Sequence, residues 1–219
     1  MAYIRDTMQS LFDTYGEREA LGPGATLLRG CALAMAATLL AEIEQIVTRA
    51  PFRHMTTPGG LKMSVAMTNC GSAGWLTDRR GYRYDAADPE TGQPWPPMPP
   101  AFLRLAREAA VEAGYEGFVP DACLVNRYEP GARLSLHQDR DEADYSHPIV
   151  SVSLGLPATF QFGGPKRGDP VKKVALHHGD VVVWGGPSRL FHHGVLALRS
   201  GEHPQTGCRR FNLTMRRSL

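Results

Sequence analysis

Residues 209–217 read RRFNLTMRR, and polar and apolar side chains alternate along this stretch. A period of two is typical of a β-strand whose two faces meet different surroundings. The apolar face, with Phe211, Leu213 and Met215, would pack into the core. The opposite face carries Arg210, Asn212, Thr214 and Arg216. Exposed strands often carry arginine, but an inward pair of guanidinium groups would bind a dianion, because arginine grips carboxylate in a bidentate fork.

Short strand patterns of this kind recur throughout the sequence after Pro120. Turn signals such as EPGA and HHGD separate the candidates ACLVNRYE, LHQD, IVSVSLGL, ATFQFGG, GDVVVWGG and GVLAL. Helical patterns cover about residues 33–48 and 100–113 in front of them. We therefore expect an α+β, mainly β fold: a sandwich or barrel core in residues 120–219, with N-terminal helices packed on one side.

Length and composition favour one compact domain. The 219 residues are 42% hydrophobic, and a domain usually takes about 100–200 residues. We expect an N-terminal arm in residues 1–30 and a single domain in residues 31–219. The net charge of +2 excludes a wholly basic surface, and the four scattered cysteines indicate free thiols in a reducing cytoplasm. The most apolar run is too short to predict a membrane span.

Residues 55–99 lack a core pattern and are rich in glycine, proline, arginine and aromatic residues. A long irregular segment inside a compact domain is typical of a lid or binding loop. In WLTDRRGYRY, residues 75–84, aromatic side chains that can stack on unpaired bases stand beside arginines that can contact phosphate. Taken alone, this segment would be more typical of an ordinary solvated loop anchored by one tryptophan.

A second informative stretch is LHQDRDE, residues 136–142. If it is extended, His137, Asp139 and Asp141 share one face. Carboxylates so close together repel unless a cation lies among them, and a histidine with a carboxylate supplies two of the three ligands of a common ferrous site. An isolated His-x-Asp is frequent by chance, so a third ligand is needed. We interpret Glu142 as a solvated neighbour.

The third ligand would come from LFHHG, where His192 and His193 are both available. Two histidines and one carboxylate leave three positions of an octahedral iron open for dioxygen and an organic chelator. Zinc would more often take four protein ligands, which no spacing here offers. The other doublet, His177 and His178, is more typical of a polar turn before a strand.

The motifs in their order resemble the AlkB family of iron(II) and 2-oxoglutarate-dependent dioxygenases, from about residue 61 to the C-terminus. They are WLTDRRGYRY, NRYEPGARLSLHQDRDE, FQFGGPKRGDP, GDVVVWGGPSRLFHHG and RRFNLTMR. Each is weak alone, and the ordered combination is specific. The resemblance implies a double-stranded β-helix, or jelly roll, with a nucleotide-recognition lid in residues 55–99. It also implies Fe(II) as cofactor, with 2-oxoglutarate and O2 as cosubstrates.

The resemblance also implies roles for individual residues. The metal ligands, and hence the catalytic residues, would be His137, Asp139 and His193, since the family places its last ligand directly before a glycine. The 2-oxoglutarate would be bound by Arg210 and Arg216, assisted by Asn126, Tyr128 and Asn212. The substrate would be contacted by Trp75, Tyr82, Tyr84, Asp141 and Arg167.

By the same resemblance, the expected activity is oxidative demethylation of N-alkylated bases such as 1-methyladenine and 3-methylcytosine, with release of formaldehyde. The expected partners are alkylated single-stranded DNA and RNA, without a membrane, and the protein is expected to be a monomer. Such bases are cationic and must leave their stack, and Asp141 would favour their charge. Two alternatives stay open: a hydroxylase of a protein or small metabolite, and a nucleic-acid-binding module without turnover.

Overall fold

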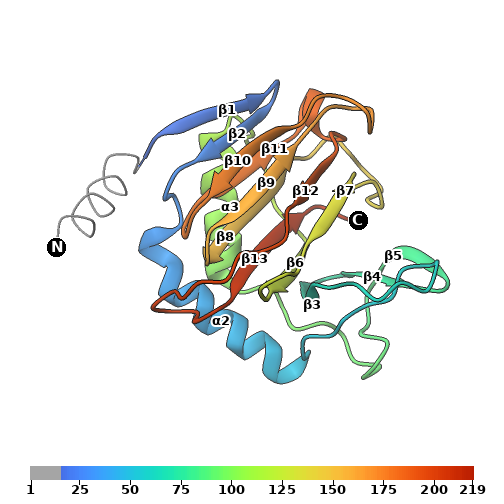
Figure 1. Ribbon diagram of the computed structural model, residues 1–219. Helices are drawn as coiled ribbons and strands as arrows, with labels where there is room; N and C mark the ends of the chain where they lie inside the picture. The colour runs from blue at the N-terminus through green and yellow to red at the C-terminus, as the bar shows by residue number, and fades with distance from the viewer. Residues whose placement is uncertain (1–15) are drawn as a thin grey trace.

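The structure, a computed structural model, describes residues 16–219 and is built mainly from two antiparallel sheets (Figure 1). Across the larger sheet lie β1 (Arg18–Gly22), β2 (Ala25–Leu28), β11 (Val181–Trp184), β8 (Ile149–Gly155), β13 (Arg210–Arg216), β6 (Ala122–Tyr128) and β3 (Ala66–Gly71). Across the smaller sheet lie β10 (Lys172–Leu176), β9 (Ala158–Phe162), β12 (His193–Val195) and β7 (Leu134–His137). A separate hairpin joins β4 (Gly74–Asp78) to β5 (Gly81–Asp85).

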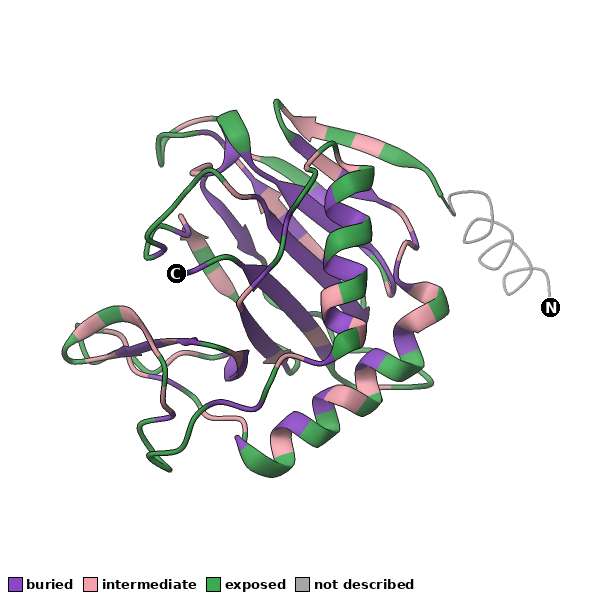
Figure 2. Ribbon diagram, turned by 180° about the vertical axis from the view of Figure 1, so that it is seen from behind, coloured by how far each residue is buried: buried purple, intermediate pink, exposed green. Residues whose placement is uncertain are grey.

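Two α-helices cover the outer face of the larger sheet, as the view from behind shows (Figure 2). They are α2 (Ala36–Arg49), which follows the 3-10 turn η1 (Leu33–Met35), and α3 (Pro100–Glu112). In α2 the buried Leu39, Ile43 and Ile46 recur at helical spacing. Proline begins α3, where its missing N–H is not needed. The two predicted helices are thus confirmed, as is the mainly β class.

The larger sheet separates two hydrophobic cores. One lies between the sheets and includes Phe160 and Phe162 from β9 and Trp184 from β11. The other lies between the larger sheet and the helices and includes Leu213 and Met215 from β13. Because both faces of the sheet are covered, its central strands are buried along almost their whole length.

Strand β13 shows how this arrangement creates a functional interior. Its apolar side chains Leu213 and Met215 pack towards the helices, as the alternation predicted. Its polar side chains therefore point between the two sheets, where Asn212 and Arg216 line a cavity. An interior face of a sheet normally carries apolar side chains, so these buried polar groups indicate a binding site.

Several boundaries differ from the predicted ones. Residues 18–28, placed in an arm, form the strands β1 and β2 of the larger sheet, and residues 1–15 of that arm lie outside the described residues. Within the predicted lid, residues 66–71 form the edge strand β3, while the β4–β5 hairpin projects beside the sheets (Figure 1). β7 ends at His137, so Asp139 and Asp141 lie in the irregular segment beyond it. No helix among residues 16–219 is long and apolar enough to cross a membrane.

Candidate metal and cosubstrate site

A cavity of about 730 Å³ opens between the two sheets. Its polar lining comes from both sheets: β7 and β12 on one side, β6 and β13 on the other. Every residue to which a site role was assigned lines this cavity, with the exception of Tyr84. Residues far apart in the sequence therefore converge on one enclosed space, as expected for a small-molecule site with a few fixed polar groups.

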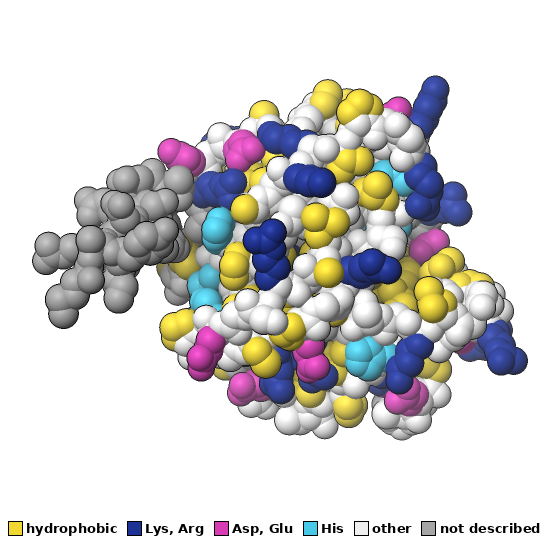
Figure 3. Space-filling view, in the orientation of Figure 1, with side chains coloured by type: hydrophobic (Ala, Val, Ile, Leu, Met, Phe, Trp, Pro, Cys, Tyr) yellow, Lys and Arg dark blue, Asp and Glu magenta, His cyan; other side chains and the backbone are white. Residues whose placement is uncertain are grey.

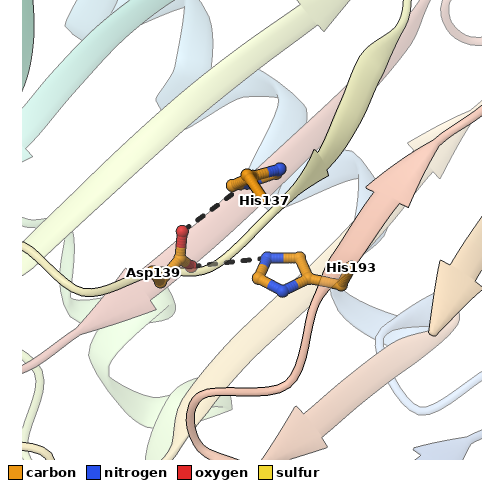
Figure 4. A group of neighbouring side chains, drawn as sticks. All are labelled: His137, Asp139 and His193. Carbon is orange, nitrogen blue, oxygen red and sulfur yellow. Dashed lines mark ion pairs between the residues drawn. The ribbon is translucent and has the colours of Figure 1, made fainter. Parts of the chain in front are cut away.

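Three potential metal ligands meet at this cavity (Figure 4). Strands β7 and β12 are paired in a register that sets His193 directly opposite His137. Asp139 follows two residues after His137, and its carboxylate oxygens lie 3.6 Å from the Nε2 atom of each histidine. The three ligand atoms lie within 4.8 Å of one another. The pairing of two strands thus brings the distant histidine to the His-x-Asp pair.

Hydrogen bonds fix the tautomer of both histidines. The Nδ1 atom of His137 lies 2.8 Å from the carbonyl oxygen of Ser135, and that of His193 lies 3.0 Å from the carbonyl oxygen of Phe191. A carbonyl oxygen only accepts, so both Nδ1 atoms are protonated donors and the Nε2 lone pairs face Asp139. Burial, helped by nearby His137, lowers the pKa of His193 to about 4, so its imidazole is neutral and ready to ligate at neutral pH.

The carboxylate of Asp139 is held in its charged form. Burial by itself would raise its pKa, but the Arg216 guanidinium, together with His193 and His137, outweighs burial and keeps the pKa of Asp139 well below its usual range. The Nε and Nη2 atoms of Arg216 donate to the same Asp139 oxygen at 3.0 and 2.6 Å. Two imidazoles and one ionised carboxylate are the donor set that suits ferrous iron with open positions.

Arg210 is a buried cation with unused donors. Its side chain is 1% exposed, and Nη2 donates to Ser153 at 2.9 Å. Its Nε and Nη1 atoms have no hydrogen-bond partner among the described residues. Burial lowers the pKa of Arg210, and the guanidinium lies 4.9 Å from the centre of the Tyr128 ring. Unpaired buried donors are costly, so this group fits a carboxylate ligand that would take up both N–H groups.

The two asparagines of the predicted cosubstrate site are linked to each other. Asn126 donates to Asn212 at 3.4 Å, while the Asn212 amide nitrogen donates to Ser151 and to the carbonyl oxygen of Val152. Asn212 is therefore already engaged with β8. The Asn126 side-chain oxygen is buried and has no hydrogen-bond partner within residues 16–219, and the contribution of both asparagines to cosubstrate binding stays a prediction.

At the cavity entrance, aromatic and acidic side chains are paired. The Trp75 indole donates from Nε1 to Asp141 at 2.7 Å and stacks on the Tyr82 ring at 5.8 Å between centroids. Tyr82 is half exposed, and Arg167 also lines the entrance. Tyr84 differs, because its hydroxyl group donates to Glu142 at 2.7 Å, and so its predicted substrate contact gains no support from its position.

Two buried charged residues beside the site, Glu142 and Arg189, were not predicted as site residues from the sequence. Glu142, expected to be solvated, is 6% exposed and lies 3.0 Å from the Arg189 guanidinium and 3.4 Å from that of Arg216. Arg189 is also buried and donates to the carbonyl oxygen of Asp139 at 2.8 Å. No local pattern could have identified this pair, since the residues that surround each of them come from distant parts of the sequence.

A histidine–carboxylate–histidine group beside a buried arginine with free donors defines a class, the non-haem iron enzymes that bind an organic diacid. The chain belongs to the 2OG-Fe(II) oxygenase superfamily, whose family model matches residues 24–216. Ferrous iron and 2-oxoglutarate are accordingly its cofactor and cosubstrate, as expected from the sequence.

The chain is also similar to individual proteins of known name. The chain is 58% identical to the Escherichia coli protein named Alpha-ketoglutarate-dependent dioxygenase AlkB, over 92% of this chain and 93% of that protein. It is 34% identical to the mouse Nucleic acid dioxygenase ALKBH1, over 61% of this chain and 34% of that protein. The solved structure of OsALKBH1 aligns with a TM-score of 0.81 at 28% identity, covering 92% of this chain and all of that one.

Proposed function

We propose that this protein repairs N-alkylated bases in single-stranded DNA and RNA by oxidative demethylation. The observation that carries the proposal is one cavity holding His137, Asp139 and His193 beside the unpaired donors of Arg210, with Trp75 and Asp141 at its entrance. The names of the relatives support it, because the similar proteins are called an AlkB dioxygenase and a nucleic acid dioxygenase. We take the two sheets to form a double-stranded β-helix and the hairpin to act as the lid.

In the proposed reaction, an N-methylated base, 2-oxoglutarate and dioxygen give the restored base, formaldehyde, succinate and carbon dioxide. Two electrons from the methyl group and two from the decarboxylated keto acid reduce dioxygen, so atoms and electrons balance. When bound, the ferrous ion and 2-oxoglutarate supply the oxidising chemistry. The protein supplies binding, orientation and the exclusion of water.

The cavity residues divide these tasks between them. The Nε2 atoms of His137 and His193, with the Asp139 carboxylate, would hold the ferrous ion. Arg210 would bind one carboxylate of 2-oxoglutarate through the two donors that it leaves free. Arg216 would contact the other carboxylate while keeping Asp139 ionised. Because these groups are already in place, little reorganisation is needed on binding.

The entrance suits an extruded, positively charged base. Trp75 and Tyr82 offer stacking faces, worth about 1–3 kcal/mol per base. Asp141 would accept from the exocyclic amine and favour the cationic ring, and Arg167 would contact the phosphate backbone. Lys and Arg side chains lie across the face that carries the smaller sheet and around the hairpin (Figure 3), which favours a polyanion. A monomeric state and a cytoplasmic location belong to the same proposal.

The test is formaldehyde release from short single-stranded oligonucleotides that carry 1-methyladenine or 3-methylcytosine. We expect one formaldehyde per repaired base, dependent on both iron and 2-oxoglutarate, and none from unmodified strands. Asp139→Ala is the matched negative control, because it removes the only carboxylate of the candidate metal group found among the described residues. If the wild type consumes 2-oxoglutarate without oligonucleotide repair, while a peptide or metabolite is hydroxylated, the assignment to nucleic acids is wrong.

A further inference from the structure

Charged side chains of alternating sign run inward from the surface loops to the metal ligand. The row consists of Arg189, Glu142, Arg216 and Asp139, and all four side chains are buried. The successive contacts measure 3.0 Å, 3.4 Å and 2.6 Å. We call these four residues the buried ion-pair row. Removing one member would leave its neighbours as unpaired buried charges, which costs far more than losing an exposed pair.

At its outer end, the row fixes the backbone on both sides of Glu142. Arg189 donates to the carbonyl oxygen of Asp139 at 2.8 Å and to that of His147 at 3.1 Å. The guanidinium also lies 5.3 Å from the centre of the Tyr145 ring. The segment after the metal ligand, residues 139–147, is therefore held at both ends by one side chain.

The lid hairpin contacts the buried ion-pair row through Glu142. Trp75 and Tyr84 are directly opposite each other on β4 and β5. Trp75 donates to Asp141, and Tyr84 donates to Glu142, so two paired aromatic residues bind two consecutive carboxylates. Burial raises the pKa of Tyr84, which keeps its hydroxyl group protonated as a donor. Asp141 is exposed and free to exchange its partner for a substrate, whereas Glu142 is fixed by two arginines.

We propose that Glu142 is a positioning residue with two effects. It orients the Arg216 guanidinium towards both Asp139 and the cosubstrate carboxylate, and it docks the lid hairpin through Tyr84. The lid and the cosubstrate site thereby share one carboxylate. The inference rests on the proposed function for the role of Arg216 in binding 2-oxoglutarate. Glu142 touches neither substrate nor cofactor and acts only through its neighbours.

The experiment compares Glu142→Gln, Tyr84→Phe and the control Asp144→Asn, which makes the same change at an exposed carboxylate nearby. Binding of 2-oxoglutarate is measured by calorimetry on protein loaded with manganese(II), which permits binding without turnover. Cleavage of the β4–β5 hairpin by a protease reports on lid docking. For Glu142→Gln we expect binding weakened about tenfold, the loss of roughly one charge-assisted contact, together with faster cleavage.

The Tyr84 hydroxyl also accepts a hydrogen bond from Nη1 of Arg216 at 3.3 Å. Tyr84→Phe should therefore give faster cleavage with a smaller loss of 2-oxoglutarate affinity than Glu142→Gln, and Asp144→Asn should change neither. Glu142→Asp, which keeps the charge on a shorter side chain, serves if the glutamine variant does not fold, and it should weaken 2-oxoglutarate binding as well. Wild-type affinity in a folded Glu142 variant would overturn the inference. Arg210→Met separates this failure from that of the cosubstrate site, because unchanged affinity in Arg210→Met would instead contradict the site itself.

Discussion

At the scale of single residues, the site depends on which hydrogen-bonding atoms the protein has already used. His137 and His193 each donate a hydrogen bond from Nδ1 to a backbone carbonyl oxygen, so only Nε2 is left to bind a metal. Arg216 donates from Nε and Nη2 to Asp139 and from Nη1 to the Tyr84 hydroxyl, whereas two donors of Arg210 have no partner among the described residues. The two arginines are therefore not equivalent: Arg216 already holds Asp139 in its charged form, while Arg210 has donors available for an anion.

The histidine doublet gives a sharp prediction at this scale. His193→Ala should weaken manganese(II) binding by more than about a hundredfold, since even the loss of an outer partner of a metal ligand typically costs about 10- to 100-fold. His192→Ala should leave the affinity close to that of the wild type, because the His192 ring is directed to the carbonyl oxygen of Gly164 at 3.2 Å. Calorimetric titration of both variants measures this. Equal losses in the two variants would show that the ligand is wrongly chosen.

Much of this residue-level arrangement was predictable from local spacing. The His-x-Asp pair and the alternation of Arg210 with Arg216 are visible in the sequence, and the structure brings these residues together. The choice of His193 over His192 needed the family resemblance. Glu142 and Arg189 were missed for a physical reason, since a charged residue reads as solvated until the fold supplies a buried partner for it.

At the scale of elements, the position of the hairpin depends on one close approach. Gly74 begins β4 and lies against the Trp95 ring, and a Cβ atom there would collide with the indole and lie 2.8 Å from the Asn69 Cβ. Trp95 is buried and donates to the carbonyl oxygen of Asp85 at the end of β5. The base of the hairpin is thus packed against the body at a point where only glycine fits.

Gly74→Ala should therefore loosen the hairpin. Forcing an extra methyl group into a packed site typically costs about 1–3 kcal/mol, and here the cost falls on the contact between hairpin and body. We expect faster proteolysis within residues 74–95 and a lower melting temperature. Gly59→Ala is the matched control, because a Cβ atom there meets nothing within 4 Å. Unchanged proteolysis of Gly74→Ala would show that the hairpin does not depend on this packing.

Several of the strands that sequence reasoning missed lack a clear period or are very short. β3, with the sequence AMTNCG, is buried on both faces except at its last residue, so polar and apolar residues do not alternate along it. β2 has only four residues, and the sequence analysis placed them in the N-terminal arm. Longer strands such as β6 and β8 were recognisable because they begin and end at clear turn signals.

At the scale of the whole molecule, the cavity lies between two sheets with different proposed tasks: one sheet carries metal-binding residues and the other carries cosubstrate-binding residues. The two histidines proposed as metal ligands come from β7 and β12 of the smaller sheet. The arginines proposed for the cosubstrate come from β13 of the larger sheet. A diacid that chelates the metal and also reaches Arg210 would therefore connect the sheets across the core.

This connection predicts that metal and cosubstrate stabilise the fold cooperatively. A ligand at one hundred times its dissociation constant adds about 2.7 kcal/mol to the free energy of unfolding. Manganese(II) and 2-oxoglutarate together should raise the melting temperature by more than the sum of their separate effects, because only the ternary complex spans both sheets. Melting curves recorded with neither, each and both ligands test this. In Arg210→Met the manganese(II) effect should persist while the extra increase disappears, and simple additivity in the wild type would contradict the bridging geometry.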